Sequence, residues 1–221
     1  MIKAIIFDMD GVISDTEYLD FQLQSKFVIE SGGTTDQEKL FDLVGKSYKN
    51  LFMTMKKLIG TEDSLELIQE KYDNFIDNTY ELIDYRDYFR KDIVKILDYA
   101  KKNNISLAVA SSSAMFHIKQ ILEQCGIIQE FDFIISGESL EESKPNPEIY
   151  LRTLENFGIN PSEAIAIEDS PGGIAAAKAA GIPVIAYLEE RMVIDQSQAD
   201  YFGKDMIEIY DIIQSLVNET K

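Results

Sequence analysis

Short apolar runs alternate with helical patterns along most of the chain, and this alternation constrains the fold more than any other feature. Five runs rich in β-branched or aromatic residues predict buried strands at Ile2–Phe7, Ile105–Ala110, Phe131–Ile135, Ala164–Ile167 and Pro183–Tyr187. Helical patterns cover Lys91–Lys102, Ser113–Gln124, Asn146–Phe157, Ser170–Ala180 and Asp205–Val217. The alternation predicts an α/β fold, a Rossmann-like parallel sheet with helices on both faces.

One segment interrupts the alternation. Between about Asp15 and Asp84 the chain has helical patterns at Phe21–Ile29, Lys39–Val44, Tyr48–Ile59 and Ser64–Tyr80, and no strand pattern. It returns to the alternating pattern through Asp84-Tyr85-Arg86-Asp87. We therefore expect a helical cap domain, residues 15–84, inserted into an α/β core made of residues 1–14 and 85–221.

The balance of charge excludes two classes of partner. The chain has 221 residues, 45% of them hydrophobic, and carries 21 Lys and Arg against 39 Asp and Glu, a formal net charge of −18. Such an acidic surface repels nucleic acid and anionic membranes, so we expect neither as a partner. An anionic ligand must enter a locally basic pocket or arrive with a metal ion. We expect the protein to be a monomer.

The cysteine and histidine counts exclude further chemistry. Cys125 is the only cysteine, so no internal disulfide can form, which fits a reducing compartment, and its apolar helical context predicts a core position. His117 is the only histidine, which argues against a zinc site or a Ser-His-Asp triad. The apolar runs are too short to span a membrane, and the first one ends in acids, unlike a signal peptide. We therefore expect a cytoplasmic protein.

Reactive side chains follow four of the predicted strands. Asp8 and Asp10 follow the first. After the second come Ser111, Ser112 and Ser113, after the third comes a loop with Lys144, and after the fourth come Glu168, Asp169 and Ser170. Ligands of open parallel sheets bind beyond the carboxyl ends of the strands. Acids, hydroxyls and a lysine should therefore meet at one edge of the sheet.

These residue types suit phosphate and metal chemistry. Carboxylates are hard oxygen ligands for Mg²⁺, a serine at a helix N-terminus suits phosphate, and Lys144 can neutralise phosphate charge. A carboxylate held against a metal-bound phosphate can act as a nucleophile. Each piece alone is also typical of a turn or a helix start. Their ordered occurrence after four strands favours a functional site.

The same residues resemble the motifs of the haloacid dehalogenase superfamily of phosphohydrolases, over nearly the whole chain. Asp8-Met9-Asp10-Gly11-Val12 resembles its first motif, Ser111 its second, Lys144 in Lys-Pro-Asn-Pro-Glu its third, and Glu168-Asp169-Ser170 its fourth. The helical insertion resembles the first cap class of that family. Within the family, the chain is most similar to the β-phosphoglucomutase-like group and its sugar-phosphate phosphatase relatives.

The resemblance implies a role for each motif residue. Asp8 would attack phosphorus, and Asp10 would protonate the leaving oxygen and then deprotonate water. Mg²⁺ would be held by the Asp8 side chain, the Asp10 carbonyl and Asp169, with Glu168 in or near the coordination shell. Ser111, Ser112 and Lys144 would bind the phosphoryl oxygens. Asp10 argues against dehalogenation, because the dehalogenases of the family lack an acid there.

In the cap, the likeness to β-phosphoglucomutase is partial. Thr16 matches that enzyme, and Lys71, which precedes Tyr-Asp-Asn-Phe, resembles its substrate-binding lysine, although such a lysine is also typical of a solvated helix face. Asp20 stands where the mutase has a histidine, and Tyr48 replaces an arginine, with Lys49 adjacent. These two differences favour a phosphatase over a mutase.

The sequence thus predicts a Mg²⁺-dependent phosphatase that acts on a small phosphorylated metabolite, a sugar phosphate or similar monoester, through an aspartyl-phosphate. One alternative is a hexose-phosphate mutase on the same scaffold. An alternative of another class is a non-enzymatic phospho-signalling module such as a receiver domain. Against the latter, the aspartate pair lies on the first strand and a helical cap follows it.

Overall fold

Six parallel strands form one sheet, which confirms the predicted α/β fold. The computed structural model describes residues 1–46, 48–80 and 83–219. The strands are β1 (Ala4–Phe7), β2 (Ser106–Ser111), β3 (Phe133–Ser136), β4 (Ala164–Glu168), β5 (Val184–Tyr187) and β6 (Tyr201–Gly203), in the order β3-β2-β1-β4-β5-β6. Because β1 pairs with both β2 and β4, the direction of winding reverses beside it. The reversal point of such a sheet is its usual ligand site.

Side-chain size distinguishes the two faces of the sheet. Since successive strand residues point to opposite faces, the large odd-numbered residues of β1, β2 and β4, such as Phe7 and Ile167, share one face. That face packs on α5 (Ile93–Lys102), α6 (Met115–Gln124) and α9 (Met206–Glu219). The even-numbered residues are mostly alanines, which leave room for Tyr150 and Ile174 from α7 (Glu148–Phe157) and α8 (Pro171–Ala179).

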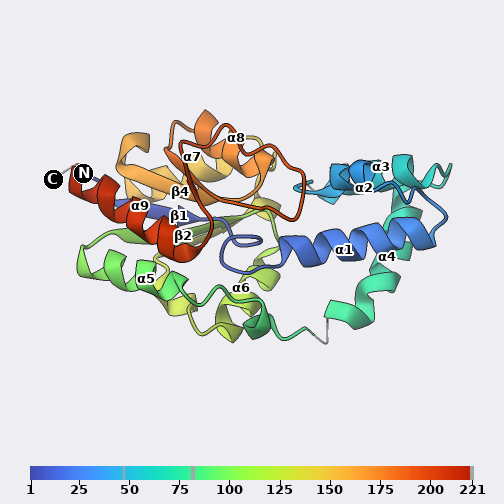
Figure 1. Ribbon diagram of the computed structural model, residues 1–221, viewed down its shortest axis with the longest axis horizontal. Coiled ribbons are helices and arrows are strands. Elements are labelled where there is room, and N and C mark those ends of the chain that lie inside the picture. The colour runs from blue at the N-terminus through green and yellow to red at the C-terminus, as the bar shows by residue number, and fades with distance from the viewer. Residues whose placement is uncertain (47, 81–82, 220–221) are drawn as a thin grey trace.

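A helical cap lies beyond the carboxyl ends of the strands, opposite the chain termini (Figure 1). It contains α1 (Glu17–Glu30), α2 (Gln37–Leu40), α3 (Tyr48–Ile59) and α4 (Leu65–Tyr80). These helices share their own apolar cluster, which includes Phe21, Phe52 and Met55. The boundaries at residues 15 and 84 stay a prediction, and residues 81 and 82 lie outside the described part of the chain.

The two segments that connect cap and core lie side by side. Ser14 and Phe89 form an antiparallel bridge, and the Asp15 amide donates to the Tyr88 carbonyl at 2.8 Å. Single-turn 3-10 helices lie between the longer elements, at Phe41–Leu43, Tyr85–Asp87, Ile128–Glu130, Gly137–Ser139 and Pro161–Glu163. The predicted return at residues 84–87 thus forms one of these turns.

The structure differs from the predicted elements at the edges of the sheet. β3 begins at Phe133 rather than Phe131, because residues 128–130 form a helical turn first. β6 was not predicted, since it has three residues and exposes both Tyr201 and Phe202, so it leaves no apolar run. Cys125 is half-buried against the core, in line with its predicted position. None of the described helices combines the length and apolarity needed to cross a membrane.

Candidate active site

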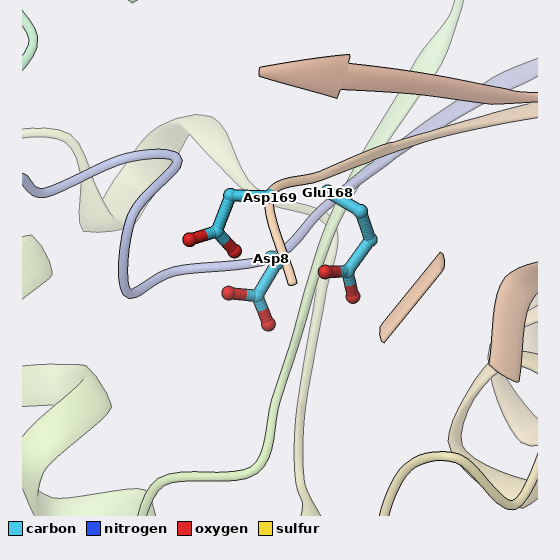
Figure 2. A group of neighbouring side chains, drawn as sticks. All are labelled: Asp8, Glu168 and Asp169. Atoms are coloured by element: carbon cyan, nitrogen blue, oxygen red, sulfur yellow. The ribbon is translucent and has the colours of Figure 1, made fainter. Parts of the chain in front are cut away.

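Three buried carboxylates meet where β1 and β4 end. Asp8 follows β1, and its amide donates to the Ile167 carbonyl at 2.9 Å, which continues the pairing with β4 by one residue. Glu168 is the last residue of β4, and Asp169 follows it. One oxygen from each of the three carboxylates lies within 4.8 Å of the others (Figure 2). We call Asp8, Glu168 and Asp169 the carboxylate cluster.

Lys144 connects two members of this cluster. Its ammonium Nζ donates to Asp8 Oδ1 at 2.5 Å, to Glu168 Oε1 at 2.6 Å and to the Ala110 carbonyl at 2.8 Å. The Tyr150 hydroxyl donates to the same Glu168 oxygen at 2.5 Å. The lysine side chain is only 7% exposed, so these contacts form where water competes little.

The loop that carries Lys144 is fixed on its C-terminal side. The peptide bond between Lys144 and Pro145 is cis. Asn146 Oδ1 accepts the Glu148 amide at 2.9 Å, and Pro147 is the residue directly before helix α7, which begins at Glu148. The helix start therefore holds the lysine toward the ends of the strands.

Burial dominates the proton equilibria of the cluster. It raises the pKa of Asp8 well above the usual range, an effect that Lys144 opposes and that Glu168 and Asp10 reinforce. Burial also raises the pKa of Asp169, and the nearby acids Glu17 and Asp8 add to the rise. Burial alone would lower the pKa of Lys144, but its two carboxylate partners raise it well above the usual value.

The cluster fits a small divalent cation. When all three carboxylates are ionised, as metal ligands must be, they and the one ammonium carry a net charge of about −2, in a region where unpaired charge is costly. Within the part of the chain that the structure describes, no donor reaches the Asp169 carboxylate, so its oxygens are available to a ligand. A set made of carboxylate oxygens suits a hard ion such as Mg²⁺.

The carboxylate of Asp10 points to hydroxyl groups rather than into the cluster. The Thr16 hydroxyl donates to Asp10 Oδ1 at 2.5 Å, and the Ser113 hydroxyl donates to Oδ2 at 2.6 Å. Asp10 would then contribute its carbonyl oxygen, and not its carboxylate, to a metal ion, as the resemblance implied. Thr16, predicted as a substrate contact of the cap, is buried against Asp10 in the structure.

Two glycines make room for the carboxylates. Gly11 has a positive φ of 81°, and a Cβ there would lie 1.9 Å from Asp169 Oδ2. A Cβ on Gly173, in the first turn of α8, would lie 2.0 Å from Glu168 Oε2. Close approach of a side chain to backbone therefore requires glycine at both positions.

The other predicted site residues divide into two groups. Ser111 is buried at the end of β2, where its hydroxyl accepts the Ser113 amide at 3.0 Å, and Ser112 beside it is exposed. Lys71 lies on α4, where its ammonium pairs with Asp63 at 2.6 Å rather than with a residue of the cluster. The side chains of Tyr48 and Lys49 lie outside what the structure describes.

Glu17 is a site residue that the sequence did not reveal. It begins helix α1, where an acid is typical of helix capping, and its Oε1 accepts the Gly45 amide at 2.9 Å. Burial, then Asp20 and Asp10, raise its pKa to about 8. The same Gly45 lies against Ser170 of the core, so Glu17 stands where the cap meets the site.

Comparisons with known proteins place the chain among phosphate-ester enzymes. The family model described as haloacid dehalogenase-like hydrolase matches residues 5–187. The chain is 32% identical over 183 residues to the phosphorylated carbohydrates phosphatase of Thermotoga maritima, which covers 82% of each chain. It is 30% identical over 198 residues to the β-phosphoglucomutase of Bacillus subtilis, covering 82% of this chain and 81% of that protein.

A solved structure agrees with these relatives. The β-phosphoglucomutase of Clostridium difficile superposes with a TM-score of 0.81 at 26% identity, and the match covers 100% of this chain and 99% of that one. The arrangement of sheet and cap is therefore shared along the whole length.

Replacing Gly173 by alanine should displace the Glu168 carboxylate, because the new methyl group would occupy its place. We expect turnover of a phosphate ester to fall about 10²-fold, the usual effect of misplacing a site group by about 1 Å. Gly172→Ala is the matched control, since its Cβ would meet only the Gly45 carbonyl at 3.7 Å. Equal turnover by the two variants would show that Glu168 needs no space beneath α8.

The raised pKa of Glu17 predicts a pH-dependent stability. Between its ordinary value of 4.5 and about 8, the unfolded chain ionises Glu17 while the folded protein keeps the proton. The folded state then binds more protons, so stability falls as pH rises through this window. In chelator, wild type should lose stability relative to Glu17→Gln from pH 5 to pH 8, measured by urea unfolding. A difference that stays constant over this range would contradict the raised pKa of Glu17.

Proposed function

Because this chain belongs to the haloacid dehalogenase-like hydrolase family, we propose that it is a Mg²⁺-dependent phosphatase for a small phosphomonoester such as a sugar phosphate. Its relatives are enzymes of phosphate esters, so the alternative of a non-enzymatic phospho-signalling module is set aside. The observation that carries the proposal is the buried carboxylate cluster with Lys144 between Asp8 and Glu168. A monomeric state and a cytoplasmic location remain predictions.

In the first half of the proposed reaction, Asp8 is the nucleophile. One of its carboxylate oxygens forms a bond to phosphorus while the ester P–O bond breaks. Asp10, in its protonated form, gives its proton to the leaving oxygen, so the alcohol departs neutral. In the structure the Lys144 ammonium donates to an oxygen of Asp8 at 2.5 Å. From this position it would donate a hydrogen bond to a phosphoryl group attached to Asp8.

In the second half, Asp10 is the base. It takes a proton from water, the water oxygen bonds to phosphorus, and the Asp8–phosphorus bond breaks to return the carboxylate and release inorganic phosphate. The hydroxyls of Thr16 and Ser113 donate to opposite oxygens of Asp10 and orient it for both proton transfers.

The remaining site residues bind and neutralise the phosphoryl group. Asp8, Asp169 and the Asp10 carbonyl would hold Mg²⁺, with Glu168 in or near its coordination shell. Bound there, the ion would offset the negative charge of the phosphoryl oxygens. Ser111 and Ser112, at the end of β2, would donate to those oxygens together with Lys144.

A hexose-phosphate mutase is the second candidate, and the superposition on a β-phosphoglucomutase structure favours it. A mutase must hold a bisphosphate, so its cap needs cationic groups near the site. Here the first turn of α1 is acidic, with Glu17 and Asp20, and Lys71 pairs with Asp63. The phosphatase of phosphorylated carbohydrates at 32% identity also supports hydrolysis and a sugar-phosphate substrate.

Removing the nucleophile should stop phosphate release. We expect Asp8→Asn to lower turnover by several orders of magnitude, because an amide oxygen does not attack phosphorus and form the acyl phosphate. The measurement is inorganic phosphate released from a panel of phosphorylated metabolites with Mg²⁺, with EDTA as a second condition that should abolish turnover. Asp98→Asn is the matched control, because Asp98 is an exposed residue of α5 outside the site. Near-normal turnover by Asp8→Asn, or full activity in EDTA, would refute the mechanism.

The two enzyme candidates predict different products from one substrate. With β-glucose 1-phosphate, Mg²⁺ and a trace of glucose 1,6-bisphosphate, we expect release of free phosphate and little glucose 6-phosphate, since the acidic cap face grips a second phosphate poorly. Both products are followed in the same reaction by coupled assays. Glucose 6-phosphate that forms faster than phosphate would establish the mutase instead.

A further inference from the structure

Residues 188–196, which follow β5, contact both the cap and the core. They are separate from the two segments through which the chain passes between core and cap, near Asp15 and near Tyr88. We call residues 188–196 the strap. Most residues of the strap are exposed or half-buried, and Val193 is 80% exposed. The side chains of Met192 and Gln196, by contrast, are only 4% and 7% exposed. The strap therefore buries one side chain at its middle and one at its C-terminal end, in two different parts of the molecule.

Met192 belongs to the apolar cluster of the cap. It joins Phe21, Phe52 and Met55 in that cluster, and Ile194 packs against its edge. The guanidinium of Arg191 stacks on the Tyr18 ring of α1 at 4.6 Å. A segment that follows a strand of the core thus completes the hydrophobic core of the cap.

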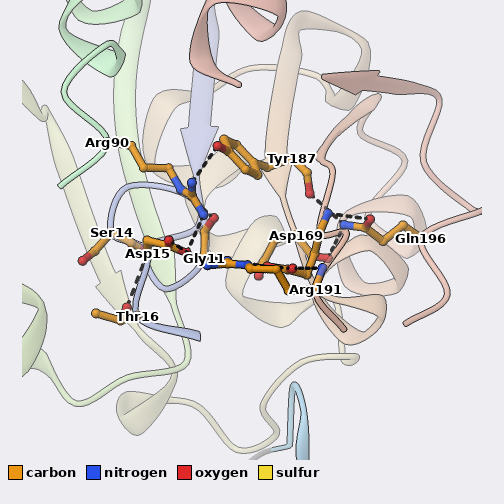
Figure 3. Close-up of polar contacts among 10 residues, drawn as sticks. Gly11, Ser14, Asp15, Thr16, Arg90, Asp169, Tyr187, Arg191 and Gln196 are labelled. Atoms are coloured by element: carbon orange, nitrogen blue, oxygen red, sulfur yellow. Dashed lines mark hydrogen bonds and ion pairs between the residues drawn. The ribbon is translucent and has the colours of Figure 1, made fainter. Parts of the chain in front are cut away.

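Gln196 is bonded to the backbone beside the carboxylate cluster. Its Nε2 donates to the Asp169 carbonyl at 2.5 Å and to the Tyr187 carbonyl at 2.8 Å (Figure 3). Its Oε1 accepts the Glu189 amide at 3.2 Å. The amide therefore uses both its donor and its acceptor ends. Asp169 is held by its backbone here, while its carboxylate stays in the cluster.

Two arginines donate hydrogen bonds to Asp15, which lies in the first segment that connects core and cap, and one of them, Arg191, belongs to the strap. Arg191 donates to both oxygens of Asp15, at 2.9 and 2.6 Å, and Arg90 donates to Asp15 Oδ1 at 2.8 Å. Arg90 also reaches the Tyr187 hydroxyl at 2.6 Å and the Gly11 carbonyl at 3.2 Å (Figure 3). The strap, this connecting segment and the glycine beside Asp169 therefore form one connected network.

The strap between the two anchors is short and internally bonded. Gln196 is four residue steps from Met192, with three residues between them, a reach of about 14 Å at most when fully extended. Between the anchors, the Ile194 amide donates to the Met192 carbonyl at 3.1 Å. Just beyond the strap, the Ala199 amide donates to the Gln196 carbonyl at 3.1 Å, which holds its C-terminal end. Displacement of Met192 with the cap would therefore strain the Gln196 contacts.

We propose that the strap couples the cap to the metal ligand Asp169, with Met192 as its cap anchor and Gln196 as the positioning residue at the site. Resting on the proposed function, this inference adds that the cap position seen here favours metal binding. By linkage, a bound cation favours the same cap position. A cap that moves away withdraws Met192 and, through Gln196, shifts the backbone of Asp169.

Direct Mg²⁺ binding, by calorimetry on the full chain without substrate, tests the site end of the strap. Gln196→Met keeps the volume and adds no charge but removes both donors, so we expect its dissociation constant for Mg²⁺ to rise at least about tenfold. Gln214→Met is the matched control, because that amide donates to Tyr210 on α9, away from the cluster. Equal affinity in Gln196→Met and wild type would overturn the proposal.

The cap end is tested by two methionines of the same cluster. Met192→Ala should also weaken Mg²⁺ binding several-fold, whereas Met55→Ala removes an equally buried cap side chain that the strap does not carry. Met192→Leu keeps the packing and should retain wild-type affinity. In the double variant Gln196→Met/Met192→Ala, the losses should not add, since both act through one connection.

Equal Mg²⁺ affinities for Met192→Ala and Met55→Ala, or additive losses in the double variant, would overturn the coupling. Circular dichroism confirms that each variant is folded, and Gln196→Met decides the proposal if Met192→Ala does not fold. Since binding is measured without substrate, failure of the proposed function is a separate result. In that case the wild-type protein would bind Mg²⁺, and the strap variants would weaken this binding as expected, but the wild-type protein would release no phosphate from the substrates.

Discussion

The ammonium of Lys144, shared between Asp8 and Glu168, is the interaction on which the site depends. Without it, three carboxylates would lie together in a region that excludes water. Removing one partner of a buried ion pair typically costs about 3–5 kcal/mol, because the other charge stays buried and unpaired. The lysine comes from the loop before α7, and the Tyr150 hydroxyl of that helix completes the bonding of Glu168. The helix and the two central strands are therefore held in place by the same charges.

This electrostatic arrangement also explains the distribution of small residues. Carboxylates can approach the start of α8 and the turn after Asp10 only where no Cβ intervenes, at Gly173 and Gly11. The alanines of β1, β2 and β4 face the same side of the sheet as Asp8 and Glu168, which continue the even-numbered positions. Small side chains on this face give Tyr150 room to reach Glu168. Packing and charge thus impose the same pattern on the sequence.

Strand order made much of the site predictable, and tertiary contacts made the rest unpredictable. Asp8, Lys144, Glu168 and Asp169 were found because parallel strands end at one edge, so position along the chain implied proximity. The cap core, by contrast, incorporates Met192 from far along the chain, in a segment with no regular pattern. Gln196 likewise donates to the backbone carbonyl of Asp169. Every residue type has this carbonyl, so the sequence does not indicate the contact.

The contacts of the two predicted cap residues could not be read from the sequence either, and their role in binding substrate stays a prediction. Thr16 and Lys71 were singled out by likeness to a relative, yet one is bonded to Asp10 and the other to Asp63. Their partners are acids of this particular chain.

The acidity of the chain and the proposed anionic substrate are reconciled by protons and cations. Burial raises the pKa values of Asp8, Asp169 and Glu17, so without a metal ion the site takes up protons instead of holding every negative charge. Since metal ligands must be deprotonated, binding of a divalent cation would release those protons. The cation would then replace positive charge that the protons supplied, and a phosphate ester would meet a site that is much less negative than the net charge of −18 implies.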